Sequence, residues 1–380
     1  MWIIDRYMLR QFLSTFVICC LSLFGLYVVF DLFTNLEEFL RCGREQDGGV
    51  LSLIASFYGY QTAVFFDQTA GLLALVAAMF TVAWIQRHNE LTALMAAGIA
   101  RTRVAAPVIV AAVFVAFLAA ANRELLIPQI RDPLSRRPQD LIGDVGQPMK
   151  LTPDNLTDIL FQGKATFANE ERISKPDLRL PQASPLGRYG QRLTAENAYY
   201  KPADGNHPGG YLLRGVSKPP GLADKESLLL DRKPIVITPR DAAWLKPDEC
   251  FVVSGITFRQ ISGGDNWQAH SSTSELIAGL RNPSLDFGAN LRVAIHARMV
   301  QPFLDVTLLF LGLPLVLRRE NRNVFLAIGT SAAVVSLFMI VTIACRQLGA
   351  SLWISPALGA WLPLFIFVPP AVVLTETMRR

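Results

Sequence analysis

The residues that could take part in chemistry form few recognisable patterns in this sequence. The four histidines are His88, His207, His270 and His296, and none stands at metal-binding spacing or beside an acidic pair. There is no GxxxxGK[ST] loop for phosphate, no GxGxxG helix start and no GxSxG turn for a nucleophilic serine. We therefore expect no catalytic residue, no metal site and no cofactor, and any ATP that drives this protein is hydrolysed by another chain.

Two carboxylates interrupt long apolar runs. Asp67 lies within residues 50–86, and Asp305 lies within residues 299–317. Because a carboxylate in hydrocarbon is costly, each is a functional candidate. For Asp67 we favour a position at the membrane interface, where it reaches headgroups or water, whereas Asp305 can equally bond a polar group of a neighbouring helix. A proton-driven carrier would need a chain of such groups, so the sequence does not favour one.

A short segment with arginine at both ends, residues 87–101, separates two apolar runs. Asn89 can cap a helix whose first turn carries Glu90, and Gly98 can end that helix in the left-handed conformation. The apolar residues of the helix share one face, and they are Leu91, Leu94 and Met95. The helix could lie in the headgroup interface or dock in a groove of a soluble partner, and the residues alone leave both possibilities open.

The elements that position these residues are membrane spans. Of the 380 residues, 51% are hydrophobic and 18% are charged, against about 25% charged in soluble chains. Crossing the hydrocarbon takes about 20 apolar residues. The expected spans are Phe12–Phe30, Phe66–Gln86, Val104–Asn122, Met299–Leu317, Val324–Cys345 and Leu352–Leu374. Since one helix over residues 50–86 would be about 55 Å long, we expect an interfacial segment before Phe66 that breaks near Gly59.

Arginine positions indicate the orientation of the spans. One set of span ends carries Arg6, Arg10, Arg87, Arg101, Arg103, Arg318, Arg319, Arg322, Arg379 and Arg380. The opposite short loops carry only Arg41, Arg44 and Arg346. We therefore expect both termini on the cytoplasmic side of the membrane. The first apolar run is expected to be an uncleaved span, because no small-residue cleavage site follows it.

The outside loop between the third and fourth spans is too long for a connector, and we expect it to be a domain. Its β-branched or alternating runs predict strands at Tyr211–Val216, Lys233–Thr238 and Phe251–Phe258. Turns are expected between them at Lys218–Gly221 and Gly263–Asp265. This pattern is typical of a β-sandwich or jelly-roll-like domain.

The same loop closes with a short helix. Ser272–Glu275 is a capping-box sequence that opens Leu276–Leu280, and Asn282-Pro283 ends the helix. The predicted fold is therefore an all-α membrane bundle of six transmembrane helices with an inserted, mostly-β, jelly-roll-like periplasmic domain. The expected divisions are 1–122 for the first three spans with a short cytoplasmic helix at 87–100, 123–295 for the periplasmic domain, and 296–380 for the last three spans.

The short cytoplasmic helix resembles a motif of a known family. Residues 87–99, Arg-His-Asn-Glu-Leu-Thr-Ala-Leu-Met-Ala-Ala-Gly-Ile, resemble the coupling helix of the lipopolysaccharide export permeases of the LptF/LptG (YjgP/YjgQ) type. Other similar positions follow in the family's order, and they are Arg6-Tyr7-x-x-Arg10, Asn122, Pro128, Ser274-Glu275-Leu276, His296-x-Arg298, Gly349 and the stretch from Pro356 to Pro363. The resemblance covers nearly the whole chain, including the layout of three spans, an outer domain and three spans.

This resemblance implies a non-catalytic permease subunit of an ATP-driven (ABC) exporter. In the family two such chains pair, a soluble ATPase dimer docks on their coupling helices, and lipopolysaccharide passes from the inner membrane to the β-jelly-roll domains and a periplasmic bridge protein. The resemblance also implies a location in the bacterial inner membrane with the outer domain in the periplasm, and it implies no cofactor and no nucleic acid. By position Glu90 matches the glutamate that meets a basic residue of the ATPase, with Leu91, Leu94, Met95 and Gly98 shaping the helix.

The sequence departs from the family near the outer end of the first span. There the family has basic residues that contact lipid phosphates, whereas this chain has Asp31, Glu37 and Glu38. Arg346, at the outer end of the fifth span, matches a basic position of one family subunit and is a candidate phosphate contact, and Arg298 is a second. The lipid is therefore lipopolysaccharide, a variant of it, or another glycolipid.

Two other interpretations stay open. A receptor whose outer β domain binds a ligand would need a cytoplasmic output module, and only six residues follow Leu374. An intramembrane enzyme would need a nucleophile or two acids at one depth, which Asp67 and Asp305 do not demonstrably provide. The exporter interpretation predicts instead that the chain copurifies with a nucleotide-binding subunit and with a sister permease or a second copy of itself.

Overall fold

A computed structural model describes most of the chain, namely residues 2–45, 49–134, 146–180, 192–204, 207–230, 233–317 and 324–379. Its contacts divide the chain into two compact units. The first, here called the helix unit, comprises Met1–Glu37, Gly48–Arg131 and Gly288–Arg380. The second, here called the β unit, comprises Glu38–Asp47 and Asp132–Phe287. Of the arginines that orient the spans, Arg318, Arg319, Arg322 and Arg380 lie outside the described residues.

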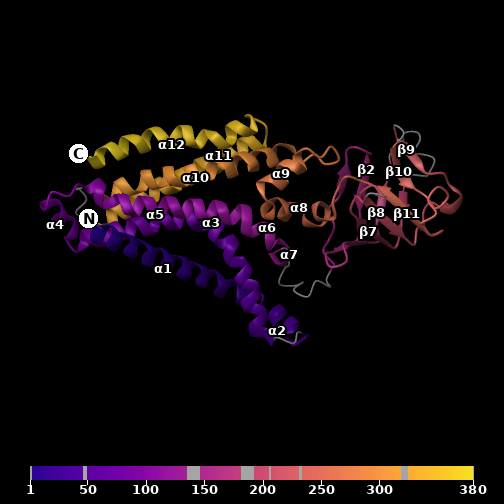
Figure 1. Cartoon of the computed structure of the whole chain (residues 1–380), viewed down its shortest axis with the longest axis horizontal. Helices are drawn as coiled ribbons and strands as arrows, with labels where there is room; N and C mark the ends of the chain where they lie inside the picture. Colours follow the sequence, from indigo (N-terminus) through magenta and orange to yellow (C-terminus); the bar gives the residue numbers. More distant parts are fainter. Residues whose placement is uncertain are drawn as a thin grey trace. The chain divides into compact units, whose positions relative to one another are not determined.

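Six helices in the described residues are long and apolar enough to cross a membrane, which confirms the predicted bundle of spans. They are α1 (Trp2–Thr34), α3 (Gly49–Arg87), α5 (Arg101–Ala121), α10 (Gly288–Leu317), α11 (Val324–Ala350) and α12 (Pro356–Arg379). The short helix α4 (Glu90–Ala96) joins α3 to α5. Within the helix unit, the start of α1, the end of α12 and α4 lie at the same end of the bundle (Figure 1).

Small residues let the central helices approach closely. The core of the helix unit contains alanines of α3 and α5, among them Ala70, Ala74, Ala77, Ala105 and Ala112. Such residues allow close backbone contact where the hydrophobic effect cannot drive association. The helices differ in burial, since 61% of the most apolar window of α10 is buried but only 6% of that of α1. Most of α1 is therefore left for lipid or another chain.

The second span is longer than the sequence indicates. The break expected near Gly59 is wrong, because α3 runs without interruption over 39 residues. One glycine costs a helix only about 1 kcal/mol relative to alanine. The first turns of α3 also gain contacts with the end of α1, where the Tyr58 hydroxyl donates to the Asp31 carboxylate at 2.8 Å and Phe24 and Tyr27 contact Phe65.

Other span limits also differ from the expected ones. The third span continues beyond Ala121 into a π-helical turn, η1 (Asn122–Leu126), and then α6 (Ile127–Gln129) and α7 (Arg131–Leu134). The fourth begins earlier, at Gly288, and the sixth begins later, at Pro356, because Leu352 has a positive φ of 62° and ends the preceding segment. The helix α2 (Leu36–Glu45) follows α1.

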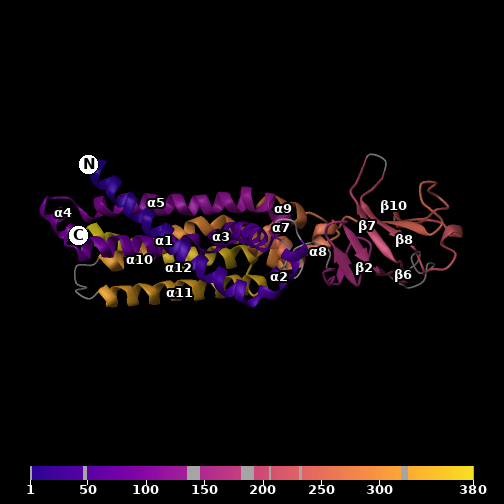
Figure 2. The same ribbon diagram turned by 90° about the horizontal axis from the view of Figure 1, so that it is seen from below.

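The β unit is built from two antiparallel sheets, in agreement with the predicted mostly-β insertion (Figure 2). The smaller sheet has the order β1-β2-β5-β6, with strands Thr152–Asp154, Ile159–Gln162, Asp177–Arg179 and Arg192–Thr194. The larger has the order β3-β4-β7-β8-β11-β10-β9, with strands Ala165–Phe167, Arg172–Ser174, Asn197–Lys201, Gly210–Arg214, Glu249–Val253, Lys233–Ile237 and Leu228–Leu230.

Both sheets contribute to one apolar core. Phe161 and Leu178 from the smaller sheet pack with Tyr211 and Cys250 from the larger one. The Tyr211 hydroxyl donates to the backbone carbonyl of Ile256 at 3.0 Å, so its polar group is satisfied. Burial raises the pKa of the Cys250 thiol to about 12 and that of Tyr211 well above its ordinary value. The five cysteines are free.

Two details of the predicted β unit are wrong. The strand expected over Phe251–Phe258 ends at Val253, and the turn expected at Gly263–Asp265 lies inside the helix α8 (Phe258–His270). Thr257 and Gln260 form a capping box that starts this helix. The next helix, α9 (Thr273–Leu280), confirms the predicted capping box, because Ser272 accepts from the Glu275 backbone N–H at 3.2 Å.

Candidate functional site

The turn that leads into α4 is closed by a backbone hydrogen bond and not by a side-chain cap. Asn89 adopts a left-handed conformation with φ 59° and its side chain makes no capping bond, so the predicted cap is wrong. Its backbone N–H instead donates to the carbonyl of Gln86 at 3.1 Å. Asparagine tolerates the left-handed region better than most residues. Asn89 therefore reverses the chain between α3 and α4.

The end of α4 follows the expected pattern. Gly98 has φ +81°, a conformation that favours glycine. The backbone N–H of Gly98 donates to the Met95 carbonyl and that of Ile99 donates to the Leu94 carbonyl, both at 3.0 Å. These two bonds make a Schellman motif, and Leu94 and Ile99 both pack against the bundle core. The end of α4 is therefore well defined.

The apolar face of α4 turns toward its own chain. Leu91 is 7% exposed and belongs to the bundle core, and Leu94 and Met95 pack against that core. The residues left exposed are small, and they are Thr92, Ala93, Ala96 and Ala97. The exposed surface of α4 is therefore formed by small side chains, and the half-buried Glu90 begins the helix.

Glu90 is held by the first span. The hydroxyl of Tyr7 in α1 donates to the Glu90 carboxylate, whose oxygens lie 3.1 and 3.3 Å away. A groove of about 400 Å³ lies beside this bond, lined by Ile3, Ile4, Tyr7, Met8, Ile85, Glu90, Ala93 and Leu94. Among the described residues that line the groove, Glu90 is the only acidic one, so these residues combine apolar walls with one negative charge.

A second group of polar residues lies within the spans. Asp67 of α3 accepts from Arg123 Nε at 2.8 Å, and the two side chains are only 13% and 17% exposed. Asp67 is thus in a mostly buried ion pair within the chain, and its expected position at the membrane interface stays a prediction. Arg123 belongs to η1, and π-helical turns are frequent at functional sites. Arg298 of α10 is close enough to interact electrostatically with both residues of the pair.

Asp305 is joined to Arg346 through an amide. Gln301 donates to the Asp305 carboxylate at 2.9 Å and accepts from Arg346 Nη2 at 2.7 Å. Arg346 Nε is buried and has no hydrogen-bond partner among the described residues. Gly71 of α3 packs directly against the Asp305 carboxylate. The candidates Asp67, Asp305, Arg298 and Arg346 therefore belong to one group of charges that interact electrostatically within the helix unit.

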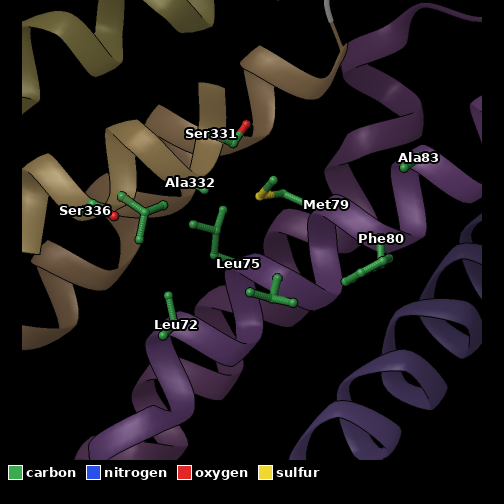
Figure 3. A pocket seen from close by; sticks show the side chains of 10 residues that line it. Leu72, Leu75, Met79, Phe80, Ala83, Ser331, Ala332 and Ser336 are labelled. Carbon is green, nitrogen blue, oxygen red and sulfur yellow. The ribbon is translucent and has the colours of Figure 1, made fainter. Parts of the chain in front are cut away.

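An apolar groove of about 310 Å³ lies between α3 and α11. Figure 3 shows Leu72, Leu75 and Met79 of α3 opposite Ser331, Ala332 and Ser336 of α11. The hydroxyl of Ser331 is buried without a hydrogen-bond partner in the described part of the chain. The groove suits a hydrocarbon chain better than a polar ligand, because its walls are almost wholly apolar.

Comparison with protein families decides the relationship. The family model described as "Lipopolysaccharide export system permease LptF/LptG" matches residues 6–206 and 235–376, nearly the whole chain. The chain belongs to the LptF/LptG family. The match takes in every one of the six membrane-spanning helices and both ends of the β unit, and leaves out only residues 207–234 between its two parts. A comparison with curated proteins gives no match.

The matched family is one of permeases of the lipopolysaccharide export system. This LptF/LptG chain is a multi-pass membrane protein with a β-rich insertion, as its fold shows. Two residues of the polar group escaped the sequence analysis, Arg123 and Gln301. Arg123 directly follows an uncharged run, so the sequence places it in the outer domain. Its pairing with Asp67 depends on the register of α3 against η1, which the sequence alone does not give.

Proposed function

We propose that this chain is the permease half of an ATP-driven exporter, which extracts lipopolysaccharide or a related glycolipid from the inner membrane and passes it to a periplasmic bridge. It would pair with a second permease chain, a paralogue or itself. Both termini and the coupling helix at residues 87–100 would face the cytoplasm, and the part of the β unit inserted between the third and fourth spans, Asp132–Phe287, would be periplasmic. ATP hydrolysis would come from a dimeric ATPase partner.

The geometry of α4 carries this proposal. A helix of seven residues is held against the bundle through Leu91 and ended by Gly98, while its other face is exposed and carries small side chains. Such a face lets a partner's groove approach the backbone closely, and Glu90 adds one charge for recognition. The start of α1 and the end of α12 lie at the same end of the bundle, as expected if all three are cytoplasmic (Figure 1).

The lipid path is supported by the arrangement along α11. Arg346 lies ten to fifteen residues from the groove residues Ser331 and Ser336, which is about 15–22 Å along a helix. The hydrocarbon of one leaflet is about 15 Å thick. A lipid phosphate at Arg346 would therefore place an acyl chain near the groove between α3 and α11. Arg298 would be a second phosphate contact from the same polar group.

The test is a charge reversal on the coupling helix. Glu90→Lys should weaken binding of the ATPase partner by about 30-fold or more, because an opposed charge pair at an interface is worth about 2 kcal/mol or more. Glu37→Lys is the matched control, since it makes the same charge change at an exposed residue near the other end of α1. The measurement is the amount of ATPase that copurifies from membranes with equal amounts of inserted chain. Normal copurification with Glu90→Lys would overturn the assignment of α4.

A further inference from the structure

The first turns of α1 are the part of that span most firmly held by the chain. Met8, Phe12 and Phe16, at four-residue spacing, are the buried residues among the described side chains of α1. Beyond Phe16 the described residues of α1 are exposed or half-buried. The anchored half is also the half that reaches α4 and α5. Contacts at this end therefore fix the position of α1 relative to the coupling helix.

Two polar contacts join this end of α1 to both sides of α4. Tyr7 donates to the Glu90 carboxylate at the start of α4, and the Asp5 carboxylate accepts from Arg103 Nη2 at 2.8 Å at the start of α5. The Asp5–Arg103 pair is about 40% exposed on each side and contributes little to stability by itself. Its place on the neighbouring helix nevertheless keeps the first turns of α1 beside α4, where the Tyr7 hydroxyl can reach Glu90.

The chemistry of the Tyr7–Glu90 bond leaves the carboxylate available to a partner. An ionised carboxylate has about four acceptor sites, and a phenol has one proton to donate. Tyr7 therefore occupies one side of Glu90, leaves its charge unchanged and limits its rotamers. A glutamate side chain otherwise loses rotamer entropy when a partner binds it, and a carboxylate that is already oriented avoids part of that loss.

We propose that Tyr7 is a positioning residue for partner docking, which holds the Glu90 carboxylate in the orientation that a cationic side chain of the ATPase meets. This inference rests on the proposed function. It makes the first turn of α1 part of the docking site, although the sequence motif for that site lies 83 residues away. Tyr7 acts on the cationic side chain of the ATPase only through Glu90 and does not contact it directly.

The experiment measures the affinity of the copurifying ATPase subunit for the full chain in nanodiscs, with Tyr7→Phe. This change removes only the hydroxyl and keeps the ring beside the groove. We expect affinity to fall about three- to tenfold, the effect of losing one hydrogen bond. Tyr60→Phe is the matched control, because Tyr60 lies on α3 with 39% exposure against 43% for Tyr7. The control should bind like the unmodified chain.

A double variant separates positioning from general stability. In a Glu90→Gln background, Tyr7→Phe should cause no further loss of affinity, because the oriented charge is already absent. Equal losses in both backgrounds, or unchanged affinity of Tyr7→Phe alone, would overturn the inference. If the unmodified chain binds no ATPase, the proposed function itself fails. That outcome is distinct from failure of the Tyr7 inference, which requires a bound ATPase that ignores Tyr7→Phe.

Discussion

The ion pair between Asp67 and Arg123 gives the sharpest test of the arrangement inside the bundle. It joins α3 to the π-helical turn that follows α5, and both side chains are mostly buried. Replacing one partner leaves an uncompensated charge in the interior, whereas replacing both removes the problem. We therefore expect Asp67→Asn and Arg123→Gln to be strongly coupled rather than additive.

The surrounding charges determine how much each substitution lowers the free energy of unfolding. Removing one partner of a buried pair costs about 3–5 kcal/mol, and the double change costs much less. Arg298 interacts with both residues, so Arg123→Gln leaves Asp67 with a second cation nearby. Asp67→Asn leaves Arg123 and Arg298, which repel each other, with only part of their charge offset by Glu124 and Asp305, so it should be the more damaging single change. We expect about 4 kcal/mol for Asp67→Asn, about 2–3 for Arg123→Gln and about 1–2 for the double variant.

The assay is unfolding of the full chain in dodecylmaltoside micelles by increasing fractions of sodium dodecyl sulfate, followed by circular dichroism. The control is Arg240→Gln, which breaks an exposed pair with Glu226 and should change stability by less than about 1 kcal/mol. Additive effects of the two single changes, or an Arg123→Gln effect larger than that of Asp67→Asn, would refute the electrostatic argument.

Further predictions concern other contacts of the two units. Gly71→Val should destabilise the bundle by about 1–3 kcal/mol in the same assay, because the added side chain collides with the Asp305 carboxylate, whereas Gly59→Val has open space and should be nearly neutral. Cys250 should resist iodoacetamide at pH 9 until the chain unfolds, because with its pKa raised to about 12 only about one thiol in a thousand is ionised. The raised pKa of Cys250 also predicts that its contribution to the stability of the β unit is full below about pH 9 and is lost as the pH rises toward 12. Melting curves recorded across this pH range would show the loss. Arg346→Glu should reduce photo-crosslinking of lipid from neighbouring positions, and an unchanged yield would remove Arg346 from the lipid path.

The sequence predicts those parts of the fold that depend on local patterns. Six runs without charge or with one carboxylate mark the spans, because crossing hydrocarbon requires them whatever the packing. The capping box at Ser272 is a similarly local signal, and it marks the start of α9 within one residue. The short helix α4 is indicated by its local sequence pattern, and the left-handed Gly98 follows from its place near the end of that pattern.

Contacts between distant residues could not be predicted in the same way. The continuity of α3 through Gly59 depends on Tyr58 reaching Asp31 of α1, and the role of Arg123 depends on which face of η1 turns toward Asp67. Tyr7 and Glu90 are likewise brought together only by the packing of α1 against α4. Each of these contacts requires the register of one helix against another, which periodicity does not contain.

The central claim is that this LptF/LptG-family chain works as the permease of an ATP-driven lipid exporter. The most direct measurement is to purify the tagged chain in mild detergent from its native membrane and to identify every bound protein and lipid by mass spectrometry. We predict a stoichiometric ATPase with a phosphate-binding loop, a related six-span chain or a second copy, and a bound glycolipid that identifies the substrate. A chain that is recovered alone in several detergents, with no ATPase, would contradict the account and favour a receptor.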